Sequence, residues 1–358
     1  MKHRILQTLP TTAVNTIDRG FTVLELLTAL AVCSLMLAMV LPIIQSSREK
    51  SRQLACQENL RQIGIASHAH EAAHRTFPYT STHFFESGPS PRILHPAISP
   101  HMSLLATLDS AVFGLLEFEK PGRDTYIISI DSPRTRPHSL SESNRQAMQA
   151  HLPVFLCPSD PNGLVGRNSY RANLGPTIYV MPPMLTDCGI QENESGAFSN
   201  AQAVAVSRFR DGLSNTAFFS ERVIGDGNTD QYTPFTDYFS TLAFPCNDAT
   251  GARTACQLSS RADPATHASY AGTTWLFGGF NQTWYNHVGG PNESIPDCSD
   301  GFSPYVVGGG IGMFSARSYH PGGVHVLFAD GHVRFMNDVI DLDVWRAIST
   351  RSGQDENS

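Results

Sequence analysis

Residues 19–44 read RGFTVLELLTALAVCSLMLAMVLPII, and this stretch decides the architecture of the chain. From residue 21 to residue 47 the only charged side chain is Glu25, and residues 26–44 contain only two polar ones, Thr28 and Ser34. At about 1.5 Å per residue, a helix over residues 26–44 is roughly 28 Å long, close to the hydrocarbon thickness of a bilayer. The core helix of a soluble protein is seldom apolar on every face. We therefore predict a transmembrane helix over residues 21–45.

The charges that precede this helix predict its orientation. Lys2, Arg4 and Arg19 are basic, and Asp18 is the lone acid among residues 1–20. Positive charge favours the cytoplasmic side of a membrane. A cleavable secretory signal is the nearest alternative, but its apolar region is shorter and ends at a small-residue cleavage site. The sequence thus predicts a single-pass protein of the inner (cytoplasmic) membrane, with a cytoplasmic N-terminus and a periplasmic or extracellular C-terminal head.

The segment from Arg19 to residue 27 resembles the start of the prepilin-like proteins, a family that includes type IV pilins and the pseudopilins of type II secretion. The features in common are Gly20, then Phe21 and Thr22, then Glu25, and the uninterrupted apolar run. This resemblance implies that a prepilin peptidase/methyltransferase removes the leader, residues 1–20, by cutting after Gly20, and that it then methylates the new amine of Phe21. It also implies other pilin-like subunits as partners.

Glu25 has a physical role in this interpretation. A carboxylate within a bilayer costs about 2.5–3.5 kcal/mol on insertion scales, so one that lies there normally has a partner. The amine created at Phe21 is the obvious partner, on the same chain or on a neighbouring subunit. Our hypothesis is that Glu25 is an assembly residue, which recruits the next protomer by neutralising its N-terminal charge.

An amphipathic continuation of the helix is predicted over residues 46–76. Apolar and polar residues recur at spacings of three and four, which places on one face Cys56, Leu60, Ile63, Ser67, His70 and His74. Phe77 and Pro78 then end the helix.

The pattern His70-Glu71-Ala72-Ala73-His74 formally matches the H-E-x-x-H motif of zinc metalloproteases. We interpret it as a coincidence of helix-end histidines, since no third ligand follows at a known spacing.

Residues 77–350 are predicted to form a β-rich head, followed by a flexible tail over residues 351–358. Short apolar runs at 154–156, 203–206 and 216–219 are separated by Pro, Gly, Asn and Asp.

The runs 324–329 and 332–336 flank Asp330-Gly331, which favours a two-residue type I′ hairpin. In that register Phe328 faces Val333 and Val326 faces Phe335, and we expect the helix to cover the apolar face. We expect Asp341 to cap a short helix whose apolar side contains Leu342, Trp345 and Ile348. The fold class is α+β, a long pilin-like helix packed on a mostly antiparallel head.

The C-terminal block carries a second resemblance. His320 is separated by nine residues from Asp330-Gly331, and this pattern resembles the His-x9-Asp-Gly signature of a large family of bacterial prepilin-like proteins with a domain of unknown function. Residues 56–66, 155–161, 211–216 and Glu221 match that family in order. The resemblance implies no known catalytic activity.

We expect His320, Asp330 and Gly331 to be structural, with His320 hydrogen-bonded to hold the hairpin. The alternative is acid–base or metal chemistry at His320 and Asp330. Residues 211–215 are interpreted as turn residues, with a calcium ion as the alternative.

The cysteines indicate an oxidising compartment. Cys33 lies in the membrane stretch, and an even set of six remains: Cys56, Cys157, Cys188, Cys246, Cys256 and Cys298. Six cysteines allow fifteen connectivities. We expect Cys246 to pair with Cys256, which is close in sequence, and Cys56 to pair with Cys157, which would join head to helix.

Composition excludes some classes of function. The net charge is −7 and no run is rich in Lys or Arg, which argues against a nucleic-acid partner. No C-x-x-C pair is present, so we expect no structural metal, and no cofactor is indicated. The sequence therefore predicts a non-enzymatic, membrane-anchored prepilin or pseudopilin-like subunit that assembles through its N-terminal helix. Two alternatives remain open: a membrane-tethered hydrolase or metal enzyme, and an anchored binding protein that does not polymerise.

Overall fold

The computed structural model describes residues 22–81, 84–85, 93–95, 98–116, 142–178, 196–200, 202–241, 248–262, 267–300 and 311–353. The chain divides into two compact units, Met1–Arg48 and Glu49–Ser358. Helix α1, Val23–His74, supplies all the secondary structure described in the first unit and begins the second. The predicted long helix is confirmed over Val23–His74, and it ends two residues before the predicted end at residue 76. Pro42 lies inside the helix.

The first unit presents apolar side chains to its surroundings. Every residue from Thr22 to Arg48 is exposed. This part of α1 is long enough and apolar enough to cross a membrane. A helix whose apolar side chains are exposed on every face is unstable in water, because the hydration of that apolar surface is unfavourable. The first unit therefore fits a single-pass membrane anchor.

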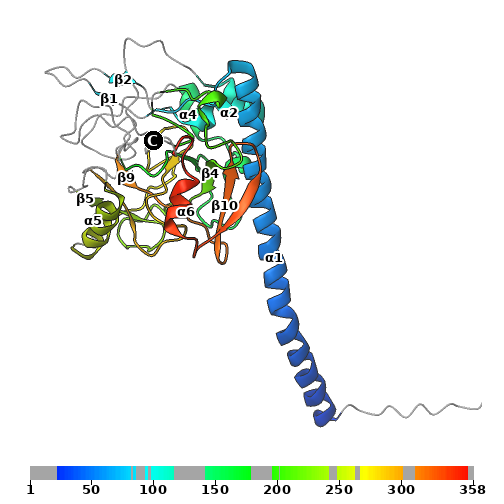
Figure 1. The fold of residues 1–358 in the computed structure, drawn as a ribbon. Coiled ribbons are helices and arrows are strands. Elements are labelled where there is room, and N and C mark those ends of the chain that lie inside the picture. The colour runs from blue at the N-terminus through cyan, green and yellow to red at the C-terminus, as the bar shows by residue number, and fades with distance from the viewer. Residues whose placement is uncertain are drawn as a thin grey trace, which may run out of the picture. The chain divides into compact units, whose positions relative to one another are not determined.

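The second unit contains two main sheets (Figure 1). We call the part of this unit that follows α1 the head. One has the strand order β11-β10-β4-β3-β7, formed by Val333–Asn337, Gly323–Phe328, Ala217–Glu221, Tyr170–Asn173 and Trp284–Tyr285. The other has the order β6-β5-β8-β9, formed by His267–Ala268, Tyr238–Thr241, Asp297–Asp300 and Gly312–Met313. A short pair joins β1, Phe84–Phe85, to β2, Ile93–His95. The described pairings between these strands are antiparallel except β3 with β7 and β5 with β8. The predicted α+β class is confirmed.

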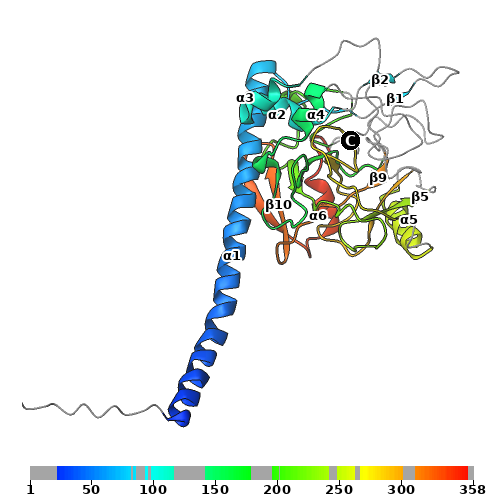
Figure 2. The same ribbon diagram turned by 180° about the vertical axis from the view of Figure 1, so that it is seen from behind.

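Short helices complete the head. They are α2 (Pro100–Leu108), α3 (Ser110–Phe113), α4 (Glu142–Met148), α5 (Ala249–Ala262) and α6 (Leu342–Ala347), with 3₁₀ turns η1 (Pro153–Phe155) and η2 (Val206–Arg208). Helix α2 lies beside the C-terminal end of α1 in both views (Figure 1 and Figure 2). The runs 154–156 and 203–206, predicted as strands, fall largely in the two 3₁₀ turns and the segments around them. Pro153 occupies the first turn of η1, where its fixed φ suits a helical start.

The C-terminal hairpin differs from the predicted register by one residue. Leu327 pairs with Val333 and Val326 pairs with Arg334. The predicted facings of Phe328 with Val333 and of Val326 with Phe335 are therefore both wrong. Of Asp330 and Gly331, only Gly331 has a positive φ, at 96°. A type I′ turn needs both, whereas a three-residue loop closed by a left-handed glycine needs one. The longer loop shifts the pairing, so each residue of β10 lies opposite a different residue of β11 than predicted.

The two faces of β10 contribute to different cores. Leu327 belongs to the same core as Leu60 and Ile63 of α1, and a Cβ added at Gly64 would lie 3.0 Å from its Cδ1 atom. The helix therefore covers the hairpin as predicted, through Leu327 rather than through Phe328. The opposite face of β10 joins Trp345 in a separate core.

The predicted helix near the C-terminus is confirmed as α6. The Asp341 carboxylate accepts hydrogen bonds from the N–H groups of Asp343 and Val344, which satisfies two donors of the first turn. Trp345 is fully buried, and Leu342 and Ile348 pack against the same core. The predicted inner face of α1 is confirmed for Cys56, Leu60, Ile63 and Ser67, which are buried together with Gly64 and Ala66. It is wrong at its C-terminal end, where His70 is partly buried and His74 is exposed.

Candidate functional site

The first unit begins with a hydrogen-bonded cap around Glu25. The Thr22 N–H and hydroxyl both donate to Glu25 Oε2, each at 2.9 Å, and the Glu25 N–H donates to Thr22 Oγ1 at 3.2 Å. This reciprocal arrangement is a capping box, which satisfies donors at the start of a helix. This cap was not predicted, although the Thr-x-x-Glu spacing is its usual signal in a sequence. Gly20 and Phe21 lie outside the described residues.

Within the head, His320 lies between two carboxylates that come from distant parts of the chain. Its Nδ1 atom is 2.7 Å from Oε1 of Glu49, on α1, and its Nε2 atom is 3.1 Å from Oε1 of Glu221, at the end of β4. Glu221 also accepts from the backbone N–H of His325 at 2.7 Å and lies 3.2 Å from its Nδ1. We call Glu49, Glu221, His320 and His325 the histidine–carboxylate cluster.

The partners of His320 determine its protonation. An ionised carboxylate only accepts hydrogen bonds, so two of them on opposite ring nitrogens require both nitrogens to donate. Burial alone would lower the pKa of His320, but the contacts with Glu221 and Glu49 outweigh it and raise the pKa. Burial raises the pKa of Glu221, and the hydrogen bonds from His320 and His325 reverse this and lower it. The cluster therefore contains a buried imidazolium held by two carboxylates.

Two other buried histidines show what burial does without carboxylates. Burial lowers the pKa of His287 to about 3, and its Nδ1 lies 2.7 Å from the carbonyl oxygen of Trp345. Burial likewise lowers the pKa of His101 to about 3, with its Nε2 2.8 Å from the carbonyl oxygen of Tyr170. Both rings are neutral hydrogen-bonding groups of the core. The flanking carboxylates are thus what makes His320 different.

A disulfide lies directly against the cluster. Cys56 of α1 is bonded to Cys157, and their Cα atoms are 5.0 Å apart. The Cys157 sulfur is 3.5 Å from His320 Nε2 and 3.9 Å from Glu221 Oε1. The predicted pairing of Cys56 with Cys157 is confirmed, and so is its role in joining helix to head.

The second predicted pairing is wrong. Cys256 of α5 is bonded to Cys298 of β8, so it is not paired with Cys246, which lies outside the described residues. Proximity in sequence misled the prediction, because the parallel pairing of β8 with β5, on which α5 packs, brings residue 298 next to the helix. Among the described residues the remaining free cysteine is Cys33.

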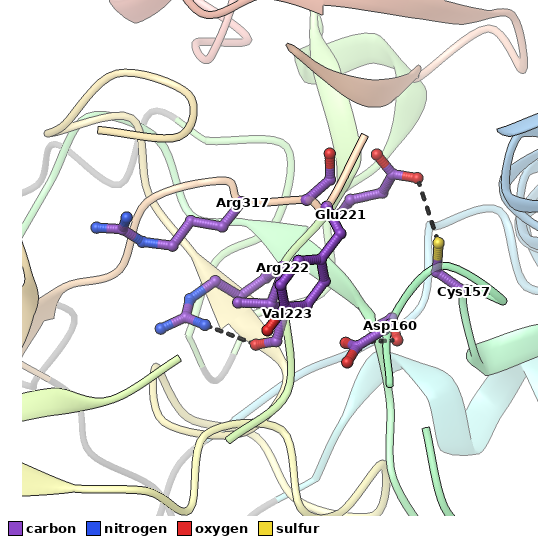
Figure 3. A pocket seen from close by; sticks show the side chains of 9 residues that line it. Cys157, Asp160, Glu221, Arg222, Val223 and Arg317 are labelled. Atoms are coloured by element: carbon purple, nitrogen blue, oxygen red, sulfur yellow. Dashed lines mark hydrogen bonds between the residues drawn. The ribbon is translucent and has the colours of Figure 1, made fainter. Parts of the chain in front are cut away.

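A small cavity of about 10 Å³, roughly the room of one water molecule, adjoins the cluster (Figure 3). Cys157 and Glu221 lie on one side of it, and the guanidinium groups of Arg222 and Arg317 point away from them (Figure 3). Both guanidinium groups are bound by the buried carboxylate of Asp297, at 2.9 Å and 3.0 Å. Asp297 therefore offsets the positive charge of these two arginines, outside the histidine–carboxylate cluster.

The structure separates His320 from the other signature residues. Asp330 is partly exposed in the hairpin loop, where its Oδ1 accepts from the N–H of His332 at 3.1 Å and lies 2.6 Å from His332 Nδ1. Asp330 is a loop-capping residue, and Gly331 supplies the left-handed conformation. His320 is connected to the hairpin through Glu221 instead, because Glu221 binds the backbone of β10 at His325.

The other candidate ligand patterns have local explanations. His70 Nδ1 lies 3.0 Å from the carbonyl oxygen of Thr76, and His74 Nδ1 lies 3.0 Å from that of His70, so both rings bind the end of their own helix. The Asp211 carboxylate accepts from the Thr350 hydroxyl and the Gly353 N–H, each at 2.8 Å, which agrees with a turn residue.

The sequence matches a protein family over residues 45–343, and that range contains the whole histidine–carboxylate cluster and the Cys56–Cys157 disulfide. The chain belongs to this family, described as a protein of unknown function (DUF1559). The predicted membership of a family with a domain of unknown function is confirmed, and the membrane stretch precedes the DUF1559 region. No significant match was found among the curated proteins or the solved structures.

Proposed function

We propose that this DUF1559 protein is a pilin-like or pseudopilin-like structural subunit of the inner membrane, cut after Gly20 and methylated at Phe21. The observation that carries the proposal is the exposed apolar surface of α1 from Thr22 to Arg48, which requires a bilayer or neighbouring helices. The motif around Gly20 and Glu25 supports assembly of that surface with other pilin-like subunits. The head then lies on the periplasmic or extracellular side, where its disulfides are stable.

A structural rather than a catalytic role fits the head. His320 is 2% exposed, and both of its ring nitrogens are bound by carboxylates of the chain itself. A general base needs access to the proton that it removes. The cluster instead connects α1, β4 and β10, three elements whose relative positions define the head. This favours a scaffold over a tethered hydrolase.

The Glu25 carboxylate tests the proposal. Glu25→Ala should leave the protein in the membrane fraction, because the substitution removes the most costly group from the apolar stretch. Recovery of the protein in large, sedimentable assemblies should fall at least tenfold, because the amine of the neighbouring subunit loses its counter-charge. Density-gradient fractionation of cell membranes and sheared surface material measures both quantities.

Two matched variants separate charge from capping. Thr22→Val removes the hydroxyl that donates to Glu25 but keeps the carboxylate, so assembly should persist. Glu58→Ala removes an exposed acid that is paired with Arg61 on the same helix, and it should behave like the unaltered protein. Undiminished assembly of Glu25→Ala would refute the proposed role of Glu25, and an unaltered protein found only as monomers would favour the anchored binding protein.

A further inference from the structure

Four potential metal ligands meet beside the small cavity. The ligand atoms of Cys56, Cys157, Glu221 and His320 all lie within 4.8 Å of one another, and all four residues are buried. They come from α1, the turn after η1, the end of β4 and the segment before β10, so the tertiary fold alone brings them together. From this geometry we infer that these four residues bind a zinc ion when the Cys56–Cys157 disulfide is reduced. The inference does not rest on the proposed function.

The distances among the ligand atoms match a tetrahedral site. Zinc lies about 2.0–2.2 Å from nitrogen and oxygen and about 2.3 Å from sulfur, so neighbouring ligand atoms of a tetrahedron are about 3.3–3.8 Å apart. His320 Nε2 is 3.1 Å from Glu221 Oε1 and 3.5 Å from the Cys157 sulfur, which is 3.9 Å from the same oxygen. The nitrogen, the oxygen and one sulfur thus lie within about 0.2 Å of the required spacing. The two bonded sulfurs must move apart to become separate ligands, and reduction of their bond permits this.

The surrounding contacts are those of an established type of metal site. The Nδ1 of His320 is bound by Glu49, which leaves Nε2 to face the ion, and a carboxylate behind a metal-binding histidine orients its ring and increases its basicity. Glu221 keeps Oε1 toward the sulfur and uses Oε2 to accept from the His325 N–H. Arg52 pairs with Glu49 and offsets its charge. Arg222 and Arg317 are engaged with Asp297, so they do not repel a cation here.

The disulfide form and the zinc-bound form are related by a reduction followed by an exchange of protons for zinc. Two molecules of a thiol reductant transfer two electrons to the disulfide, forming two cysteine thiols and the oxidised reductant. Zinc then replaces the two thiol protons and the Nε2 proton of the His320 imidazolium, so binding releases three protons and strengthens as pH rises. Either the disulfide or the ion joins α1 to the head, so the connection is preserved in both redox states.

The test uses the full-length protein in detergent, reduced with a phosphine, incubated with zinc and freed of excess metal. Elemental analysis should find about one zinc ion per reduced chain and none above background in the oxidised chain. Cobalt added in place of zinc should give the thiolate-to-cobalt absorption of a tetrahedral site in the reduced chain alone. The cobalt spectrum needs no substitution, so it does not depend on how well a variant folds.

Variants assign the ligands. Cys56→Ser with Cys157→Ser should abolish zinc binding, and His320→Gln should weaken it at least tenfold. Cys256→Ser with Cys298→Ser removes the second disulfide of the described residues and should leave zinc binding unchanged. The inference is overturned if the reduced chain binds no zinc, if binding survives loss of Cys56 and Cys157, or if the reduced, zinc-treated chain loses its circular dichroism.

Discussion

Replacing both Cys56 and Cys157 with serine should lower the free energy of unfolding of the head by about 4.7 kcal/mol. The reason is the length of the chain segment that this disulfide closes. The two cysteines are 101 residues apart, so the bond removes many conformations from the unfolded chain. Guanidinium titration of the oxidised full-length protein in detergent, with a chelator present, measures the change. The fluorescence of Trp275, Trp284 and Trp345 reports on the head, since all three are fully buried there.

Two further variants provide reference values for this loss of stability. The Cys256–Cys298 disulfide spans 42 residues, so its replacement with serines should cost about 3.9 kcal/mol, less than the first. Cys33→Ser changes an exposed free cysteine and should leave the unfolding of the head unaltered. Equal stability of the Cys56, Cys157 double variant and the unaltered protein would show that this disulfide does not hold the head to its helix.

His320→Ala should destabilise the head by about 3–5 kcal/mol near pH 6, because it leaves the buried carboxylate of Glu221 without its cation. The matched control is His332→Ala, in the hairpin loop of the same sheet, where a partly exposed histidine contacts the partly exposed carboxylate of Asp330. Its cost should stay below about 1 kcal/mol. The same fluorescence titration measures both variants, and equal costs at the two histidines would contradict the buried ion pair.

The cost of losing His320 should depend on pH. The pKa of His320 is raised on folding, so its contribution is complete below the ordinary value of 6.5 and disappears as pH rises through the raised value. The pKa of Glu221 is lowered, so its contribution is complete above the ordinary value of 4.5 and disappears as pH falls through the lowered value. The difference between the unaltered protein and His320→Ala should therefore be largest between pH 4.5 and 6.5 and smaller at pH 9. A cost that is the same at pH 6 and pH 9 would mean that His320 is neutral in the folded protein.

The features that depend on local pattern were predictable from the sequence. The apolar run and the spacing of Cys56, Leu60 and Ile63 predicted the length of α1 and its buried face, because helical periodicity is a short-range property. The cap at Asp341 followed from its position before a periodic apolar segment. The hairpin was found, but its loop type was not, because Asp-Gly fits both a two-residue loop and a three-residue loop with a left-handed glycine.

The candidate site depends on contacts that no short-range pattern contains. Glu49 and His320 are 271 positions apart, and nothing in the amphipathic pattern of α1 distinguishes Glu49 from the other acids of that helix. Glu221 was noted as part of a family resemblance, but its position beside His320 follows from the pairing of β4 with β10. The partner of Cys256 was missed for the same reason, since a crossover between strands brings Cys298 to it.

The measurement that tests the central claim most directly is mass spectrometry of the N-terminal peptide of the protein isolated from cell membranes. We predict a chain that begins at Phe21 and carries a methyl group on its amine, because the resemblance places the cut after Gly20 and the apolar helix directly after it. A mature chain that still begins at Met1, or one found free of membranes with its start beyond Ile44, would contradict the assignment as a pilin-like subunit.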